Sequence, residues 1–308
     1  MRIIILGSAA GGGFPQWNCL CPNCARARAG DPAALPRTQS SAAVSTDGRQ
    51  WFLLNCSPDI RWQVEQTPDM QPRRAVRDSP IAGVILTNAD VDHVAGLLSL
   101  RESQPFILYA TGRVLAALAD NPIFAVLRAD LVQRRSLSLD DPIALQGPTG
   151  AAGGLTIEAF AVPGKVALYL EDPAAMAFGS VAEDTVGLKL SEPETGRSFF
   201  YLPGCAAMPP ALAERLRDAE LVLFDGTTWR DDEMPASGAG AKTAGRMGHM
   251  CMSDAGGSLA AFASLNVRRK IYVHLNNTNP ALLADSTERA ALEAHGWQVA
   301  TDGMEIEL

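Results

Sequence analysis

One stretch constrains the fold of this chain more than any other, because in residues 81–97 an apolar segment runs directly into a polar turn. Residues 84–86 are expected to form a short buried strand, and Asp90, Asp92 and His93 follow soon after it. Three side chains that can bind a metal, fixed by a turn at the end of a rigid strand, need little further ordering to act together. The stretch therefore indicates a metal site, although an aspartate-rich turn that caps the next helix would produce the same pattern.

The length and composition of the chain are those of a globular protein. Its 308 residues, 47% of them hydrophobic and 19% charged, suffice for one large or two ordinary domains. A net charge of −8 argues against nucleic acid or an anionic membrane surface as the main partner. No apolar run approaches the roughly 20 residues of a membrane span, and the apolar start is too short for a secretion signal. We therefore expect a cytoplasmic protein with no membrane span.

Strand patterns dominate both halves of the sequence, with helical patterns between them and no break in composition. We therefore predict a single α/β (α+β) domain over residues 1–308, built of two sheets flanked by helices. Residues 231–248 are rich in glycine, alanine and charge and are expected to form a mobile surface loop, a candidate lid. Strands are expected at residues 3–6, 42–46, 51–55, 84–86, 106–109, 155–162, 166–170, 185–190, 198–202, 221–224, 270–273, 297–300 and 304–308, and helices at 60–66, 94–101, 114–119, 210–218, 253–265 and 280–295.

Polar side chains that can bind metals or carry protons follow several of these strands. Asp225 comes directly after one strand, and His274 follows another, with Asn276 and Asn277 close behind it. Strand ends that share one edge of a sheet bring distant residues together. We therefore expect these side chains to lie near the polar turn at residues 90–93.

His249 lies on a glycine-flanked turn before a predicted helix and is a candidate catalytic residue, for proton transfer or substrate contact. A histidine that caps a helix or fills the core is the alternative interpretation. Asp225 is the second catalytic candidate, because a carboxylate there could orient the ring of His249 or His274; it could equally be a turn aspartate. His295, near the end of a predicted helix, is interpreted as an ordinary surface or capping residue.

The order of these features resembles the metallo-β-lactamase superfamily. That family has a His-x-His-x-Asp-His motif after a buried strand and a late strand that ends in histidine. In this chain residues 88–93 read NADVDH in place of the motif, a cysteine cluster follows the first strand, and His274 ends the late strand. The resemblance implies an αββα sandwich of two mixed sheets flanked by helices.

Within that superfamily, the chain resembles the pyrroloquinoline quinone (PQQ) biosynthesis protein B family nearly from end to end. A related phosphodiesterase branch shares the cysteine cluster and the terminal segment but keeps histidines that this chain lacks. The segments that carry the resemblance are FPQWNCLCPNC at residues 14–24, MGHMCMSD at 247–254, HLNNTNP at 274–280 and DGMEI at 302–306.

Three ligand positions of the superfamily have changed in this chain. Asn88, Gly164 and Gly204 stand where two histidines and the bridging aspartate would be expected. A binuclear hydrolase needs ligands for two ions about 3.5–4 Å apart that activate water between them. The first metal site is therefore depleted, and the bridging ligand is absent.

The second metal site keeps Asp92, His93 and His274. Two histidines and one carboxylate with open positions are the ligand set of non-haem Fe(II) oxygenases, and Asp90 would add a fourth oxygen ligand or hold a bound water. This set agrees with the activity that the family resemblance implies. That activity is an Fe(II)- and O2-dependent hydroxylation of the tyrosine moiety of the peptide-derived PQQ precursor.

Two other functions remain open from the sequence. The chain could be a carrier or accessory for the transport of PQQ or its precursor to the periplasm, a role proposed for the family. It could also be a residual hydrolase that uses water bound to a single ion. The candidate partners are the precursor or PQQ itself, other proteins of the PQQ pathway, and a second copy of the chain in a homodimer.

Cys19, Cys21 and Cys24 resemble the structural zinc clip of the family. Three thiolates within six residues can close around a tetrahedral ion, with a fourth ligand brought from elsewhere. Reduced cysteines in a loop without metal are the alternative interpretation.

The fourth ligand of this clip is open. In the related phosphodiesterases it is a histidine, and the matching position here is Asn277, a poor zinc ligand. Cys56 and Cys251 are the other candidates. We do not expect a disulfide framework in a chain of this length.

Overall fold

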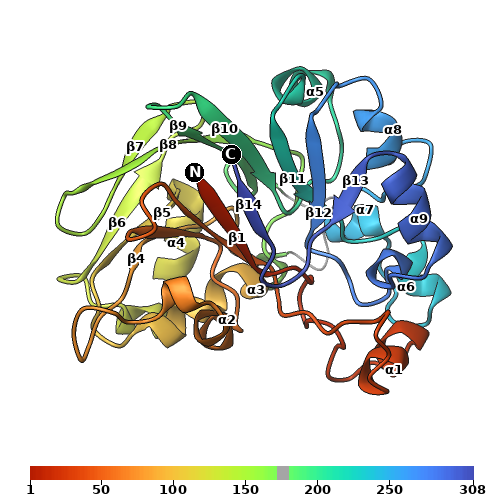
Figure 1. The fold of residues 1–308 in the computed structure, drawn as a ribbon, viewed down its shortest axis with the longest axis horizontal. Helices are drawn as coiled ribbons and strands as arrows, with labels where there is room; N and C mark the ends of the chain where they lie inside the picture. Colours follow the sequence, from red (N-terminus) through yellow and green to blue (C-terminus); the bar gives the residue numbers. More distant parts are fainter. Residues whose placement is uncertain (172–179) are drawn as a thin grey trace.

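The structure is a computed structural model that describes residues 1–171 and 180–308. Within these residues, fourteen strands form two sheets of seven strands each. Figure 1 shows both chain ends at β1 and β14, which pair antiparallel. Each sheet contains a block of parallel strands, and the ends of these strands carry the site.

The first sheet is antiparallel from β14 to β3 and parallel from β3 to β6. Its β2–β3 hairpin turns at Asp47, whose carboxylate accepts the N–H groups of Arg49 and Gln50, as the predicted turn requires. The strand order is β14 (Glu305–Glu307), β1 (Arg2–Gly7), β2 (Ser41–Ser45), β3 (Trp51–Leu54), β4 (Ile81–Ile85), β5 (Phe106–Thr111) and β6 (Val132–Leu137).

The second sheet is parallel from β13 to β10 and antiparallel from β10 to β7, so both sheets are mixed. The strand order is β13 (Trp297–Val299), β12 (Arg269–Val273), β11 (Leu221–Asp225), β10 (Arg197–Leu202), β9 (Val186–Glu192), β8 (Ala152–Ala161) and β7 (Ile143–Gln146).

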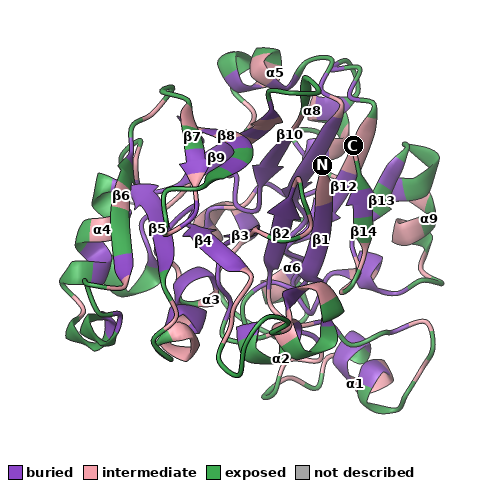
Figure 2. Ribbon diagram, turned by 60° about the vertical axis from the view of Figure 1, so that its left-hand side comes forward, coloured by how far each residue is buried: buried purple, intermediate pink, exposed green. Residues whose placement is uncertain are grey.

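Alternation along the strands divides the core into three layers. In β1, Ile3 and Ile5 face the second sheet, whereas Ile4 and Leu6 face the helices on the outside. Figure 2 shows the central strands buried, β6 largely exposed and much of the helical surface exposed. The layers form the αββα sandwich that the sequence predicted. The first sheet is covered by α2 (Ile60–Gln66), α3 (Val91–Val94) and α4 (Gly112–Ala119), and the second by α5 (Pro210–Leu216), α8 (Ser258–Phe262) and α9 (Thr287–Ala294).

The prediction of a strand at residues 166–170 is wrong. The structure places the short 3-10 turn η4 (Leu168–Leu170) there, and its apolar side chains are exposed. Conversely, β6 and β7 were not predicted, because Arg134 and Arg135 interrupt the apolar pattern of β6 and β7 has four residues.

Several helices are shorter than predicted because capping residues interrupt the pattern. The helix predicted at 253–265 begins only at Ser258, after Gly257 as its N-cap. The helix predicted at 280–295 is divided, because the Ser286 hydroxyl accepts the Arg289 N–H and starts α9 anew after η5 (Pro280–Leu282). The helix predicted at 94–101 is α3 followed by η2 (Ala95–Leu100).

The remaining elements are short. The predicted loop at 231–248 contains two one-turn helices, α6 (Glu233–Ala236) and α7 (Ala244–Met247); its mobility stays a prediction. The short helix α1 (Pro22–Arg28) follows the cysteine segment. In the parts of the chain that the structure describes, no helix combines the length and apolar character needed to cross a bilayer. The other short 3-10 turns are η1 (Pro68–Met70) and η3 (Pro122–Val126).

Candidate metal centre

The ends of parallel strands in both sheets bring the predicted polar side chains to one place. β4 leads into α3, which carries Asp92 and His93. Asp225 is the last residue of β11, and His274 directly follows β12. Because β11 and β12 are parallel neighbours, their ends lie side by side, and the first sheet supplies the opposite wall.

Three of these side chains direct ligand atoms at one another. The His274 Nε2 lies 3.0 Å from Asp92 Oδ2, and the His93 Nε2 lies 4.0 Å from the same oxygen. The two imidazole rings meet edge to face with centroids 5.3 Å apart. Asp92, His93 and His274 therefore form a group whose ligand atoms all lie within 4.8 Å of one another.

The tautomer of His93 is set by its neighbour Asn88. The His93 Nδ1 lies 2.7 Å from Asn88 Oδ1, which also accepts the N–H of Asp90. An amide oxygen only accepts, so Nδ1 carries the proton and Nε2 presents its lone pair. This Nε2 is buried and has no hydrogen-bond partner among the described residues. A buried acceptor without a partner is costly, and a metal ion would satisfy it, so the donor set fits a metal.

His274 is held by Thr227 in the same way. The Thr227 hydroxyl donates to Asp225 Oδ1 at 2.7 Å, so it accepts from His274 Nδ1 at 2.9 Å and leaves Nε2 free to bind an ion. The backbone of His274 has φ +59°, a left-handed conformation that residues other than glycine adopt uncommonly. A ligand in such a conformation indicates a backbone fixed by its surroundings.

Asp225 and His249 form a second pair beside the first group. The His249 Nδ1 donates to Asp225 Oδ2 at 2.6 Å, and the same oxygen accepts the Cys205 N–H at 2.9 Å. The His249 ring stacks on that of His274, with centroids 5.1 Å apart and planes inclined by 24°. The structure thus places both predicted catalytic candidates against the ligand group, with His274 shared between the two clusters.

The electrostatics of the group suit a metal ligand set. Burial lowers the pKa of His93 to about 4, so the ring is neutral at neutral pH. Burial works to raise the pKa of Asp92, but the electrostatic interaction with His93 and the hydrogen bond from His274 outweigh it and hold this pKa below its usual range. Burial favours the neutral ring of His274, yet the hydrogen bond to Asp92 raises its pKa. An ionised carboxylate beside a neutral imidazole gives the protonation states that ligation requires.

Asp90, the fourth predicted ligand, is paired with a lysine. Its Oδ1 accepts from Lys165 Nζ at 2.9 Å and from the Leu168 N–H at 3.3 Å. Asp90 lies close enough for its charge to raise the pKa of both His93 and His274. It is outside the group of converging ligand atoms, and its assignment as a ligand stays a prediction.

The positions where superfamily ligands are lost are filled differently. A Cβ on Gly164 would lie 2.6 Å from the Cβ of Thr185, so Thr185 occupies the space of any side chain there. A Cβ on Gly204 would make an ordinary contact of 3.7 Å with the ring of His249. The first metal site is therefore closed at one lost position and open at the other.

The cysteine cluster forms a separate group on the other side of the loop after β12. The thiols of Cys19, Cys21 and Cys24 converge, and the side-chain amide of Asn277 lies 3.1, 3.6 and 3.4 Å from their respective sulfurs. The Asn23 amide donates to the Asn277 carbonyl at 3.2 Å and fixes this arrangement.

The two other cysteines that the sequence offered as the fourth ligand lie elsewhere. Cys56 is fully buried in the outer layer of the first sheet, and the Cys251 thiol donates to Asp254 at 3.1 Å. Among the described residues, no further cysteine, histidine or carboxylate joins the three thiols. Asn277 is the side chain that faces them.

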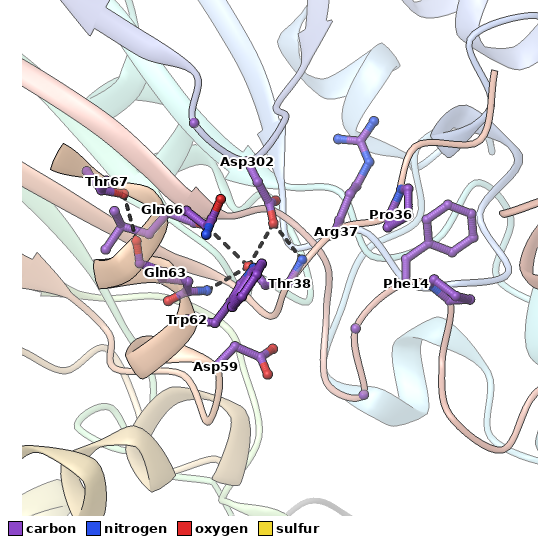
Figure 3. A pocket seen from close by; sticks show the side chains of 15 residues that line it. Phe14, Pro36, Arg37, Thr38, Asp59, Trp62, Gln63, Gln66, Thr67 and Asp302 are labelled. Atoms are coloured by element: carbon purple, nitrogen blue, oxygen red, sulfur yellow. Dashed lines mark hydrogen bonds between the residues drawn. The ribbon is translucent and has the colours of Figure 1, made fainter. Parts of the chain in front are cut away.

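A pocket of about 590 Å³ lies beside the centre, behind the glycine-rich loop after β1 (Figure 3). The loop separates the two, because a Cβ on Gly11 would lie 3.3 Å from Asp92 Oδ2 while Gly12 and Gly13 line the pocket. The polar wall is bonded to itself, since the Thr38 hydroxyl donates to the Asp302 carboxylate at 2.7 Å. The pocket wall therefore supports the loop next to the metal group.

Sequence reasoning missed Thr227 and Lys165. Thr227 lies two residues after Asp225, where the end of a strand could have indicated it. Lys165 lies one residue after a lost ligand, but no local pattern shows that its side chain reaches Asp90 across the site.

Comparisons with known proteins agree with this fold. The profile of the β-lactamase superfamily domain matches residues 50–275. The chain is 55% identical to coenzyme PQQ synthesis protein B of Gluconacetobacter diazotrophicus over 99% of this chain and 98% of that protein. It is 51% identical to the protein of the same name from Methylorubrum extorquens, with both chains fully covered.

Solved structures show the same fold. The crystal structure of Zn2+-bound PqqB from Methylobacterium extorquens superimposes with a TM-score of 0.94 at 51% identity, and the match covers both chains completely. A diphosphatase from the PhnP family shares the fold, with a TM-score of 0.69 at 19% identity, over 100% of this chain and 98% of that one.

Proposed function

The chain belongs to the family of coenzyme PQQ synthesis protein B, within the β-lactamase superfamily, and on this premise we propose that it acts in PQQ biosynthesis as an Fe(II)- and O2-dependent hydroxylase of the tyrosine moiety of the peptide-derived precursor. The observation that supports the proposal is the convergence of two histidines and one carboxylate, with the buried Nε2 of His93 left without a partner. This ligand set leaves coordination positions open for O2 and substrate.

In this proposal Asp92, His93 and His274 hold the ion. Ferrous iron, when bound, supplies the activation of O2 that the closed-shell phenol ring cannot achieve alone. Asn88 and Thr227 act behind the ligands, because their hydrogen bonds keep the Nδ1 protons in place and aim both Nε2 atoms at the ion.

His249 has the role of proton carrier. Its Nδ1 is bonded to Asp225, which leaves Nε2 as the nitrogen that can exchange a proton with the substrate hydroxyl. The buried Asp225 carboxylate orients this ring through that hydrogen bond. One atom of O2 enters the ring and the other leaves as water. The two electrons and two protons come from further oxidation of the catechol to an ortho-quinone, so a phenol and O2 give an ortho-quinone and water.

We assign the three thiols to a structural zinc site. The side-chain amide of Asn277 faces all three sulfurs, and a turn of about 180° about its last bond would present Oδ1 as the fourth ligand. A cytoplasmic location, a homodimer and contacts with other proteins of the pathway stay predictions.

The test is metal analysis after anaerobic purification, on the native chain and on an Asp92→Ala/His93→Ala variant. The proposal expects iron that the variant loses and zinc that both proteins keep. It also expects the iron-loaded native protein to consume O2 with a tyrosine-containing precursor peptide, and the zinc-loaded protein to consume none.

Two results would contradict the proposal. If the variant keeps all its metal, the strand-end group is not a metal site. If iron binds but no pathway peptide stimulates O2 uptake, while PQQ binds tightly and unchanged, the carrier function would replace the hydroxylase.

A further inference from the structure

Lys165 is a cation held inside the candidate site of an otherwise acidic protein. Its Nζ lies 2.9 Å from Asp90 Oδ1 and 3.3 Å from the Val166 carbonyl, and its side chain is 13% exposed. An ammonium group has three N–H donors, so these two contacts leave one donor for a ligand.

The ammonium belongs to a segment next to two ligand positions at which this chain differs from the superfamily. Asp90 occupies the place of the second histidine of the superfamily motif, and Lys165 directly follows Gly164, the place of another lost ligand. Two changed ligand positions therefore bring an acid and an ammonium together beside His93, because Asn88 accepts both the Asp90 N–H and the His93 Nδ1 proton.

Three separate elements hold Lys165 in this position. A Cβ on Gly248 would lie 2.8 Å from Lys165 Cγ, so the lysine stem packs on the bare backbone just before His249. The Thr185 hydroxyl donates to the Lys165 carbonyl at 2.9 Å, and Asp90 fixes the ammonium from the first sheet. A lysine constrained from three sides is preorganised for a ligand.

An apolar surface follows the ammonium directly in the chain. Leu168, Tyr169 and Leu170 are 61, 43 and 47% exposed, although they are large apolar side chains. A positive charge beside exposed apolar groups suits a ligand that has both a carboxylate and an aromatic ring.

We propose that the Lys165 ammonium is an anion subsite that binds a carboxylate of the substrate beside the ion held by Asp92, His93 and His274. This inference rests on the proposed function because it uses the same centre, and it adds the substrate class, an aromatic compound that carries a carboxylate. With a chain charge of −8, one fixed cation also selects where an anion can bind.

The test measures binding of a matched pair of probes to the full-length, zinc-loaded protein, in which no oxidation occurs. The probes are 3-(4-hydroxyphenyl)propionate and its neutral amide, titrated by NMR into the native protein and into Lys165→Met. We expect the variant to bind the acid about 10- to 100-fold more weakly, the range for loss of a charge-assisted hydrogen bond, and to bind the amide unchanged. Lys165→Arg should retain most of the affinity for the acid.

A double variant separates this function from a structural one. If Lys165 only neutralises Asp90, then Asp90→Asn/Lys165→Met should bind the acid as well as native protein does. The anion subsite predicts that the double variant still binds it weakly, whereas Asp90→Asn alone binds it at least as tightly as native protein.

Equal acid binding by the native protein and Lys165→Met overturns the proposal, and so does native protein that does not prefer the acid over the amide. The hydroxylase proposal fails separately, because the binding experiment needs neither iron nor O2. Loss of acid binding in Lys165→Met together with absent O2 uptake would leave the anion subsite in place and remove the hydroxylase.

Discussion

The two metal-competent groups of this protein differ in how they are built. The thiols of the cysteine cluster come from six consecutive positions, Cys19 to Cys24, next to the short helix α1. The strand-end group joins Asp92 and His93 of the first sheet to His274 of the second, 181 positions after His93 in the chain.

The donors differ in the same sense. In the proposed zinc site, three soft sulfurs and one amide would complete a closed tetrahedron and leave no position for a substrate. Two imidazoles and one carboxylate leave positions open. A local cluster can thus hold an ion for stability, whereas a group assembled by the fold can also hold an ion for chemistry.

The two groups nevertheless share one short loop. His274 begins it, and Asn277, three residues later, faces the cysteines. The loop is supported from below by Glu233, whose carboxylate accepts from the Thr278 hydroxyl at 2.5 Å. Loss of the ion at one site should therefore lower the metal affinity of the other site.

The largest effect should follow removal of the cysteine ion. We expect Cys21→Ser/Cys24→Ser to lose its zinc and about 4 kcal/mol of unfolding free energy, which lowers Tm by about 10 °C. Through the shared loop it should also bind the strand-end metal more weakly. Elemental analysis and calorimetry measure both changes.

The matched control is Cys251→Ser, in which a hydroxyl can still donate to Asp254. It should keep its zinc and Tm. If the double variant has normal strand-end metal affinity despite losing zinc, the two groups are independent.

An intermediate effect should follow Thr227→Val, which removes the hydroxyl between Asp225 and His274. We expect strand-end metal affinity to fall about 10- to 100-fold, because the ring loses the partner that sets its tautomer. Competition with a chelator measures this, and the cysteine zinc should be unchanged.

Thr228→Val is the control, since the Thr228 hydroxyl is buried without a hydrogen-bond partner in residues 1–171 and 180–308. It should bind metal normally. Equal loss in both variants would mean that the effect comes from packing and not from the hydrogen bond.

The smallest effect should follow Glu233→Gln and appear only in the pH dependence of stability. Burial raises the pKa of Glu233 from 4.5 to about 7, so the folded protein binds this proton more tightly than the unfolded chain. The free energy of unfolding should therefore fall as pH rises from about 4.5 to 7.

Glutamine resembles the protonated acid and removes this dependence. Native protein and variant should be equally stable near pH 5, and the variant about 2 kcal/mol more stable at pH 8. Denaturant titrations at the two pH values test this. If the free energy of unfolding changes equally with pH in both proteins, the protonation of Glu233 does not affect stability.

Short-range patterns predicted two sheets flanked by helices and most members of both groups, whereas the αββα sandwich was implied by the family resemblance. Apolar runs followed by polar turns marked Asp92, His93, Asp225 and His274, and spacing marked the cysteines. The pairing of these segments needed the family resemblance, since local patterns do not determine which strand ends meet.

The contacts of Lys165 and Thr227 could not be predicted, because they depend on how loops fold against other elements. The apolar residues 166–170 illustrate the reason. Their composition is that of a buried strand, yet the ion pair and backbone contact at Asp90 hold this segment beside the centre. Residues 166 and 167 are buried there, whereas residues 168–170 are exposed. Tertiary contacts overrode local preference.

The Thr185 side chain that fills the space above Gly164 bears on whether the lost hydrolytic centre could be regained. A histidine at 164 would place its Cβ 2.6 Å from the Thr185 Cβ, whereas a side chain at 204 meets only an ordinary contact. A side chain at 164 would therefore require glycine at 185 first, because any other residue keeps the Cβ that lies in the way. A single substitution to histidine at 164 would reduce stability before it offered a ligand.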